Sequence, residues 1–324
     1  MDKEIAKETC AIDALHAFLK ANADLIRLQI LKLLENESFN VQELCQILAI
    51  KQSALSHHLK LMASSELVST RREGNTIYYR RQIPQSQSPF FSLQTALWKL
   101  LANCEMSEEH SQQIEQVNQL RVAKSQQFFV DNAKKFRSQQ DLIASFAQYE
   151  VAVADFIKSI SLPSHQHVIE IGPGEGLFLP RLAQEFKQVS AFDIAAELLV
   201  EAEQVVAQAG LSNVSLTLGD TAVARSQVQA ADCAVLNMVL HHVASPVDIF
   251  HDVAASLKPQ GAMVVTDLCH HDQEWAKTAC GDVWLGFEPD ELSQWAFDAG
   301  FKQGQSSYLA QRNGFRIQIR HFIK

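Results

Sequence analysis

The apolar residues of the first eighty positions recur every three or four residues and later alternate with polar ones. The first spacing predicts two helices within residues 11–36, separated near Asn22–Asp24. A third helix is expected at Asn40, where Asn40 and Glu43 form a variant of the capping box, and a fourth over residues 53–62. The alternating segments LVSTR and TIYYRR, joined by REGN, predict a β-hairpin. Helix, helix, turn, helix and hairpin in this order predict a winged helix-turn-helix domain.

The fourth predicted helix, SALSHHLKLM, has an apolar and a polar face. Leu55, Leu59 and Met62 share the apolar face, whereas His57 lies on a polar stripe. His58 is turned about 100° from His57 and is expected to be half-buried, so the two rings make poor joint ligands for one metal. The second helix of a helix-turn-helix enters the major groove with its N-terminal residues. The predicted DNA contacts are therefore Lys51, Gln52, Ser53, Ser56, His57 and Lys60 on the helix and Arg71, Arg72 and Arg80 on the hairpin. The alternative is a solvated helix face and a solvated hairpin.

Four segments within about residues 11–82 carry a family resemblance. FLKANADLIRLQILKLL, VQELCQIL, QSALSHHLKLM and REGNTIYYR resemble the ArsR/SmtB family of winged-helix repressors. The resemblance implies a homodimer that releases its double-stranded DNA operator when an effector binds. Two departures stand out. Cys45 is alone where arsenic-sensing members carry a CxC pair, so a metal-responsive repressor is only the third hypothesis, and Lys51 is a poor N-cap because its charge opposes the helix dipole.

Strands alternate with helices in the C-terminal half of the chain. VIEIG, VSAFDI, VSLTLGD, DCAVLNMV and AMVVTDL are apolar strand-like segments, and helical runs separate most of them; a PQG turn precedes the last. This alternation predicts a parallel, doubly wound sheet. The turn signal Asn313-Gly314 predicts an antiparallel strand pair at the end of that sheet. The predicted fold class is thus α/β overall, with an N-terminal winged helix-turn-helix and a C-terminal doubly wound, Rossmann-like domain.

The glycine turn after the first of these strands favours one kind of ligand. The glycines form GxGxG rather than the dinucleotide fingerprint GxGxxG, because residue 177 is Leu. Glu170 and Glu175 would repel a pyrophosphate but would suit a cationic amino group and a sulfonium. Asp193, at the next strand end, can hold both ribose hydroxyls without supporting the core, and Asp220 can accept from an adenine amine.

These motifs, together with NMVLHH at residues 237–242, resemble class I S-adenosylmethionine-dependent methyltransferases from about residue 165 to 324. The resemblance implies that S-adenosylhomocysteine or S-adenosylmethionine is bound. The expected binding residues are Glu170, Gly172, Gly174, Gly176, Asp193, Ile194, Asp220, Thr221, Asn237 and His242. The alternative is a Rossmann-like domain that binds nothing.

Histidines follow the fourth and fifth strands, as the pairs His241-His242 and His270-His271. They are candidates for general bases or for metal ligands, and they are equally compatible with ordinary polar loops. No metal site is predicted, and the catalytic residues stay unassigned.

The middle of the chain reads as a connection. Residues 82–89 are polar with two prolines, and the following segment FFSLQTALWKLLANC is apolar on too many sides for a lone surface helix. It is expected to bury against a second protomer. KSQQFFVDNAKKF resembles the helical lead-in of methyltransferase-like domains, although residues 112–160 are also readable as a helical spacer. The predicted division is 1–88 for DNA binding, 89–160 for dimerisation and linker helices, and 161–324 for ligand binding.

The chain's charge is distributed unevenly. Of 324 residues with a net charge of −9, residues 1–88 carry 11 basic and 10 acidic residues, which leaves 17 and 27 for the rest. The local field decides phosphate binding, so the N-terminal part remains compatible with DNA. The six cysteines form no CxxC pair, the N-terminus MDKEIAKETC is no signal peptide, and no run of 18 apolar residues occurs. These features predict a cytoplasmic protein outside the membrane.

Two functions remain in competition at this point. The fused arrangement, with HHDQEW and GDVWLGFEPDEL late in the chain, resembles ArsR-type regulators that carry a methyltransferase-like domain. That resemblance implies a repressor that senses S-adenosylhomocysteine or S-adenosylmethionine and controls methionine-cycle genes. The alternative is an active methyltransferase of a small molecule with an autoregulatory winged helix. Both use the same ligand residues, and methyl transfer can proceed by proximity without a diagnostic triad.

Overall fold

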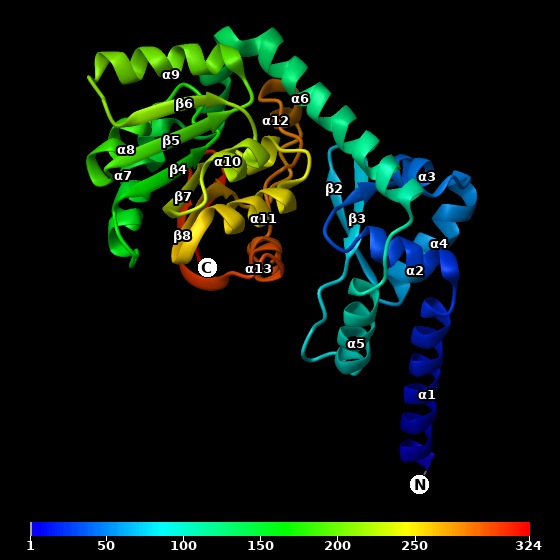
Figure 1. Cartoon of the computed structure of the whole chain (residues 1–324). Coiled ribbons are helices and arrows are strands. Elements are labelled where there is room, and N and C mark those ends of the chain that lie inside the picture. Colours follow the sequence, from blue (N-terminus) through cyan, green and yellow to red (C-terminus); the bar gives the residue numbers. More distant parts are fainter. Residues whose placement is uncertain (1) are drawn as a thin grey trace. The chain divides into compact units, whose positions relative to one another are not determined.

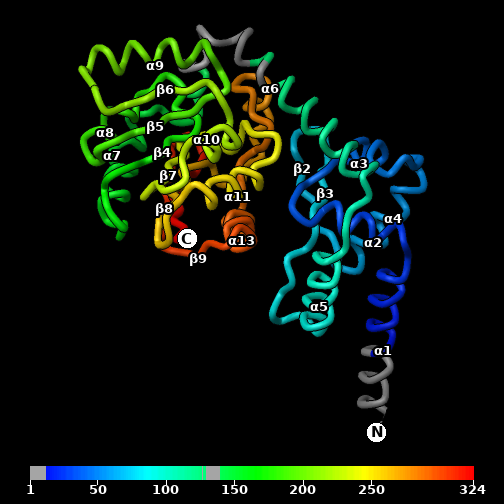
Figure 2. The backbone as a smooth tube through the Cα atoms, viewed as in Figure 1, coloured from blue at the N-terminus to red at the C-terminus, as the bar shows by residue number. Residues whose placement is uncertain are grey.

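The computed structural model describes the backbone of residues 2–324 and the side chains of residues 12–125, 127–128 and 139–324 (Figures 1 and 2). The chain divides into two compact units. The first ends at Asn118 and the second begins at Gln119. The predicted division at residues 88 and 160 stays a prediction. Cys10 and part of KSQQFFVDNAKKF lie outside the described side chains.

The first unit is a winged helix-turn-helix, as predicted (Figure 1). Its three strands are ordered β1-β3-β2, with β2 and β3 antiparallel around Gly74. The elements are α1 (Asp2–Asn22), α2 (Leu25–Leu33), β1 (Phe39–Asn40), α3 (Val41–Leu48), α4 (Gln52–Ser64), β2 (Val68–Glu73), β3 (Thr76–Arg81) and α5 (Phe91–Ala102). The helix α6 (Glu108–Ile143) begins in this unit and ends in the next.

Local capping explains where the helices of the first unit begin. Asp24 caps α2 by accepting the N–H of Arg27 over 3.0 Å. Asn40 and Glu43 form the predicted capping box of α3. The helix α4, by contrast, begins after Lys51 with no side-chain cap. Its residues Leu55, Leu59 and Met62 are buried, which confirms the predicted apolar face.

The second unit is built on one seven-stranded sheet with the order β6-β5-β4-β7-β8-β10-β9. Strands β4 to β8 are parallel, and β10 is antiparallel to both β8 and β9. These strands are β4 (His167–Ile171), β5 (Gln188–Asp193), β6 (Val214–Leu218), β7 (Ala231–Asn237), β8 (Leu257–Leu268), β9 (Lys302–Ala310) and β10 (Arg316–Ile323). The predicted doubly wound sheet and its terminal antiparallel pair are thus confirmed.

Helices cover both faces of this sheet. Right-handed crossovers place α8 and α9 on one face and α11 on the other, because the chain runs outward from β4 in one direction and from β7 in the other. The helices are α7 (Phe146–Ser159), α8 (Leu179–Glu185), α9 (Ala196–Gln208), α10 (Thr221–Gln227), α11 (Pro246–Ser256), α12 (Trp275–Ala279) and α13 (Pro289–Asp298), with the short 3-10 helix η1 (Leu240–His242). The strand order reverses between β4 and β7, and ligands of open α/β sheets bind at the carboxyl ends of the strands at such a point.

One predicted boundary differs from the structure. The PQG segment does not separate a helix from a strand, since β8 already begins at Leu257 and runs through it. Gln260 takes the left-handed conformation, with φ of 63°, and the register against β7 shifts beside it. The turn signal therefore marks an irregularity within the strand. In the described part of the chain, no helix is long and apolar enough to cross a membrane.

Candidate functional site

The polar stripe of α4 is solvent-exposed along its length. All six predicted contacts of this region are exposed: Lys51, Gln52, Ser53, Ser56, His57 and Lys60. His58 is half-buried, as expected, with its Nδ1 lying 3.4 Å from Arg27 Nη1 and 3.7 Å from Asp24 Oδ1. The ring planes of His57 and His58 lie at 69°, so the two imidazoles do not share one ligand position.

The three predicted arginines of the hairpin lie in different environments. Arg72 is exposed, and Arg80 donates from Nε to Ser69 Oγ over 2.9 Å. Arg71 is buried, and its Nε lies 2.6 Å from Oε1 of the buried Glu73. Arg71 and Glu73 are two positions apart in β2 and therefore share a face of the strand. This placement favours a structural role for Arg71 within the hairpin over the predicted DNA contact.

Two helices of the first unit expose apolar side chains. On α5, Gln94, Trp98 and Leu101 face the core, while another face stays in solvent. The exposed or half-buried apolar residues are Ile12, Leu15 and Leu19 on α1 and Leu93, Leu97 and Leu100 on α5. Each set follows helical spacing, so each forms a continuous stripe.

The glycine loop after β4 needs its glycines for two distinct reasons. Gly172, Gly174 and Gly176 all have positive φ, at 66°, 54° and 76°. A Cβ at Gly172 would collide with Val239 of the loop after β7, and a Cβ at Gly176 would lie 2.9 Å from Cβ of Ala202. Nothing lies within 4 Å of the Cβ position of Gly174. The backbone is therefore open to a ligand at Gly174 and closed by packing on either side.

Asp193 holds this loop in place. Its Oδ2 accepts the N–H of Gly174 over 3.0 Å, and its Oδ1 accepts the N–H of Ala195 over 2.9 Å. Burial raises the pKa of Asp193 against the opposing effect of these hydrogen bonds. Asp193 thus orders the glycine loop, and its predicted contact with a ribose stays a prediction. Ile194, the next residue, is exposed at the same strand end.

Glu170 and Asn237 form a buried polar pair across β4 and β7. Asn237 Nδ2 donates to Glu170 Oε1 over 3.4 Å. Burial raises the pKa of Glu170 to about 8, while the hydrogen bond from Asn237 lowers it and the charge of Asp193 raises it. Without a ligand, Glu170 is therefore mostly protonated at neutral pH, and its charge beside a cationic ligand stays a prediction. Glu170 Oε2 and Asn237 Oδ1 are buried and find no hydrogen-bond partner in the described part of the chain.

The residues after β6 make hydrogen bonds within the protein. Asp220 is exposed and caps α10 by accepting the N–H of Val223 over 3.1 Å with its Oδ1. Thr221 is buried, and its hydroxyl donates to Asp252 of α11 over 2.7 Å. The hydroxyl of Thr221 thus serves the packing of α10 on α11, whereas Asp220 remains accessible to a ligand.

The two histidines of η1 are buried among carboxylates. His241 Nδ1 lies 2.8 Å from Asp267 Oδ1, and Asp282 Oδ1 lies 3.9 Å from His241 Nε2 and 3.8 Å from His242 Nδ1. Burial lowers the pKa of His241, but the negative charges of Asp267 and Asp282 outweigh it and raise the pKa to about 9. Burial and the neighbouring His241 lower the pKa of His242. The sequence did not single out Asp267 and Asp282, although Asp267 is the charged residue of the mostly apolar segment AMVVTDL.

His242 and its neighbours make polar contacts with the helix α6. Its Nε2 lies 3.0 Å from Gln140 Nε2, and its carbonyl accepts from Ser125 Oγ over 3.2 Å. Arg121 Nη1 donates to Ala244 O over 3.3 Å. The C-terminal part of α6 is thus joined to the loop after β7 by buried polar contacts. The placement of His242 does not favour the predicted ligand contact.

The other two histidines have separate environments. His270 Nδ1 lies 3.1 Å from Leu285 O, and His271 Nδ1 accepts the N–H of Gln273 over 3.2 Å. Neither joins the group that His241, His242 and Asp282 form. The four histidines therefore do not make one site in the described structure.

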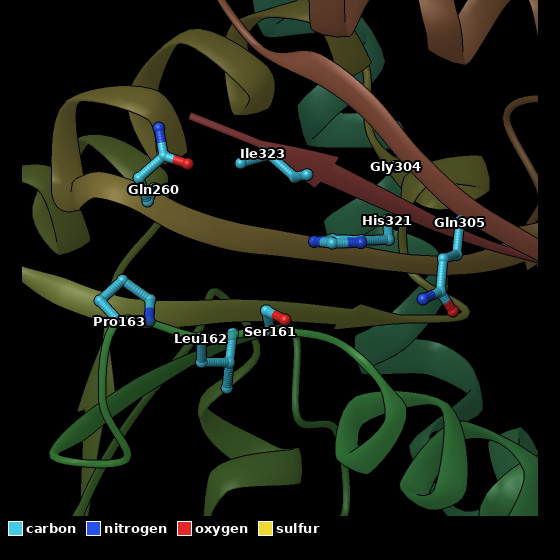
Figure 3. A pocket seen from close by; sticks show the side chains of 8 residues that line it. All are labelled: Ser161, Leu162, Pro163, Gln260, Gly304, Gln305, His321 and Ile323. Carbon is cyan, nitrogen blue, oxygen red and sulfur yellow. The ribbon is translucent and has the colours of Figure 1, made fainter.

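A separate cavity of about 350 Å³ lies beside β10 (Figure 3). It is lined by Ser161, Leu162, Pro163, Gln260, Gly304, Gln305, His321 and Ile323. Since residues 161–163 precede β4 and Gln260 lies near the start of β8, the cavity lies toward the amino end of the parallel strands, away from the glycine loop. Both ring nitrogens of His321 are buried without a hydrogen-bond partner in the described residues.

Comparison with curated proteins finds relatives for each unit. Residues of this chain are 24% identical over 182 positions to the ubiquinone biosynthesis O-methyltransferase of Xanthomonas axonopodis pv. citri, covering 51% of this chain and 76% of that protein. The transcriptional activator HlyU of Vibrio cholerae is 46% identical over 61 residues, which cover 19% of this chain and 56% of HlyU. The nodulation protein NolR of Rhizobium meliloti is 47% identical over 62 residues, which cover 19% of this chain and 51% of NolR. The chain thus spans about half the length of these two regulators.

Solved structures and family matches agree with this division. The magnesium protoporphyrin IX methyltransferase of Synechocystis PCC 6803, solved with bound SAH, superposes with a TM-score of 0.51 at 14% identity, covering 63% of this chain and 99% of that one. This likeness shows a shared fold. Residues 24–70 match the bacterial regulatory protein family arsR, and residues 143–306, just over half of the chain, match the methyltransferase domain family. The chain therefore belongs to the methyltransferase domain family and is a fusion, in which a DNA-binding helix-turn-helix domain of the arsR family precedes the methyltransferase domain.

Proposed function

We propose that the chain is a homodimeric transcriptional repressor whose methyltransferase-like domain senses S-adenosylhomocysteine or S-adenosylmethionine and thereby controls methionine-cycle genes. The observation that carries the proposal is the course of α6, which begins in the DNA-binding unit and is joined by Ser125 and Gln140 to the loop after β7 in the other unit. A ligand that orders this loop acts directly on a helix shared by both units. Coupling between two binding sites needs a connection of this kind with two arrangements.

The residues around the glycine loop fit a nucleoside ligand with an amino-acid tail. Gly174 leaves the backbone open, and Asp193 and Ile194 lie at the adjacent strand end, where a ribose and an adenine would be held. The unpartnered Glu170 Oε2 and Asn237 Oδ1 are acceptors suited to an ammonium group. Such a ligand supplies the hydrogen-bond donors that these buried acceptors lack.

The resemblance to ArsR-type regulators that carry a methyltransferase-like domain supports a preference for S-adenosylhomocysteine. S-adenosylmethionine would have to fit an extra methyl group and a positive charge into the same pocket. We therefore expect S-adenosylhomocysteine to be the stronger effector.

The apolar stripes of α1 and α5 support the homodimer. They expose leucine and isoleucine side chains along two helices, whereas α3 of the same unit buries its Leu44, Ile47 and Leu48 in the core. Pairing two copies would place two α4 helices near half-sites about 34 Å apart. A ligand that changes this spacing lowers the affinity for DNA.

An active methyltransferase is the second candidate, and the similarity of about half of the chain to a ubiquinone biosynthesis O-methyltransferase favours it. One experiment separates the two. DNA selected by the full chain from a random pool is labelled and titrated by fluorescence anisotropy at fixed salt, with each ligand in turn and with adenosine as the control. S-adenosylhomocysteine is expected to lower DNA affinity, and DNA to lower S-adenosylhomocysteine affinity by the same factor. If neither ligand changes DNA affinity while the chain consumes S-adenosylmethionine with an acceptor, the enzyme replaces the sensor.

A further inference from the structure

Three buried side chains around η1 converge on one point. The candidate ligand atoms of His241, His242 and Asp282 all lie within 4.8 Å of one another. The side chains of His241 and Asp282 are fully buried, and His241 Nε2 has no hydrogen-bond partner in the described part of the chain. A buried polar atom without a partner is costly, so this nitrogen calls for an occupant.

Asp267 orients His241 for such an occupant. Its Oδ1 lies 2.8 Å from His241 Nδ1, and its Oδ2 accepts the N–H of Leu240 over 2.9 Å. The carboxylate therefore holds the proton on Nδ1 and directs Nε2 toward Asp282, where a metal ion would take the place of any Nε2 proton. A carboxylate on the far nitrogen of the ring is the usual support of a histidine that binds metal.

We propose that His241, His242 and Asp282 bind one divalent transition metal ion of the zinc class. Two imidazoles and one carboxylate suit zinc and its neighbours, whereas magnesium and calcium prefer oxygen ligands alone. The separations of 3.9 Å and 3.8 Å between Asp282 Oδ1 and the two histidines exceed by less than 1 Å the distance of about 3.3 Å between ligands of a tetrahedral zinc ion, and all three ligand atoms lie within 4.8 Å of one another. Side-chain rotation closes this difference, and any proton on His241 Nε2 or His242 Nδ1 is released to solvent as the metal binds.

The surroundings can support the bound state. The N–H groups of Val283 and Trp284 donate to His241 O over 2.9 Å and 3.0 Å, so the segment that carries Asp282 is already fixed to η1. Rotation of the Gln140 amide would let His242 Nε2 donate to the amide oxygen, and Nδ1, which lies 3.4 Å from Gly281 O, would exchange that contact for the metal. The metal would thus fasten the loop after β7, whether the domain senses a ligand or transfers a methyl group.

Cobalt titration of the metal-free full chain tests the site. One equivalent of Co²⁺ is expected to give the visible bands of a tetrahedral ion without the near-ultraviolet band of a cobalt–thiolate bond, and Zn²⁺ is expected to displace it. Asp282→Asn and His242→Gln should each weaken binding by at least about 100-fold, and Asp267→Asn by about 10- to 100-fold. The matched control is His321→Gln, which alters another buried histidine with unpartnered nitrogens and should leave binding unchanged.

Spectroscopy of the unmodified chain keeps the test independent of variant folding. The Zn²⁺-loaded chain should show a first shell of nitrogen and oxygen only in X-ray absorption, and Zn²⁺ should raise the melting temperature. A sulfur ligand, a thiolate band or the absence of binding at one equivalent would overturn the proposal. So would full affinity in folded Asp282→Asn and His242→Gln variants.

Discussion

The carboxylate of Asp193 accepts the backbone N–H of Gly174, so one side chain at the end of β5 fixes the loop after β4. Asp193→Asn keeps the size of the side chain but turns an amide donor toward one of the two N–H groups. We expect the variant to lose about 1–3 kcal/mol of unfolding free energy and to bind S-adenosylhomocysteine much more weakly. Urea denaturation and calorimetry measure the two effects. If the folded variant binds S-adenosylhomocysteine as tightly as the unmodified chain, Asp193 does not contribute to the ligand site.

The buried carboxyl of Glu170 makes stability depend on pH. The pKa of Glu170 rises from 4.5 to about 8 on folding. The stability that the protonated carboxyl contributes to the folded state is therefore complete below pH 4.5 and is lost as the pH rises through 8. The unfolding free energy of the unmodified chain should fall by up to about 1.4 kcal/mol per pH unit within this window, relative to Glu170→Gln. Denaturation of both proteins at a series of pH values gives this difference. Parallel stability curves would show that Glu170 ionises normally.

Recognition by α4 is testable one side chain at a time. His57→Ala or Ser56→Ala should weaken binding to the selected DNA by about 1–3 kcal/mol if a base contact is lost. Arg72→Ala should weaken binding to all sequences and reduce the salt dependence. Arg71→Met, in contrast, should lower the free energy of unfolding, measured by urea denaturation, because it removes the ion pair with the buried Glu73. Anisotropy at several salt concentrations separates these outcomes, and unchanged binding in His57→Ala, Ser56→Ala and Arg72→Ala would contradict the DNA-reading role of α4 and the hairpin.

The exposed stripe of α5 predicts a change in oligomeric state. The double variant Leu93→Glu, Leu100→Glu places charges in the proposed dimer interface and should give monomers in sedimentation velocity, with weakened DNA binding. The control is Val200→Glu with Leu218→Glu, which alters exposed apolar residues of the second unit. A dimer that survives the α5 variant, or a monomeric unmodified chain, would refute the interface.

Coupling through α6 predicts a variant in which ligand and DNA influence each other less. Ser125→Ala removes the hydrogen bond to His242 O and should reduce the factor by which S-adenosylhomocysteine changes DNA affinity. Such coupling energies are typically about 1–3 kcal/mol. Ser111→Ala, an exposed position on the same helix, is the control. Anisotropy with and without ligand gives the factor, and the prediction fails if Ser125→Ala couples as strongly as the unmodified chain.

Features encoded by neighbouring residues were predictable from the sequence. The capping box of Asn40 and Glu43, the apolar face of α4 and the glycine loop depend on residues a few positions apart. The alternation of strands and helices likewise predicted the parallel sheet, because each crossover buries one strand beside the next.

Features that join distant segments were not predictable in the same way. The pairing of His241 with Asp267 and Asp282 depends on the sheet order and on the course of the loop after β8. The pKa of Glu170 depends on burial that no local pattern records. The burial of Arg71 could have been predicted more easily, because the alternation of residues along β2 already places Arg71 and Glu73 on one face.

The missing side-chain cap of α4 links helix stability to recognition. A polar residue in place of Lys51 would accept an N–H of the first turn and stabilise the free protein by about 1 kcal/mol. Such a cap would also use a backbone N–H group that can otherwise donate to a DNA phosphate. Lys51 instead adds a positive charge beside that N–H group. If α4 enters the groove as proposed, the first turn completes its hydrogen bonds only in the complex. Amide exchange at Ser53 and Ala54 should then slow on binding, and a better-capped protein would be a more stable but poorer reader of DNA.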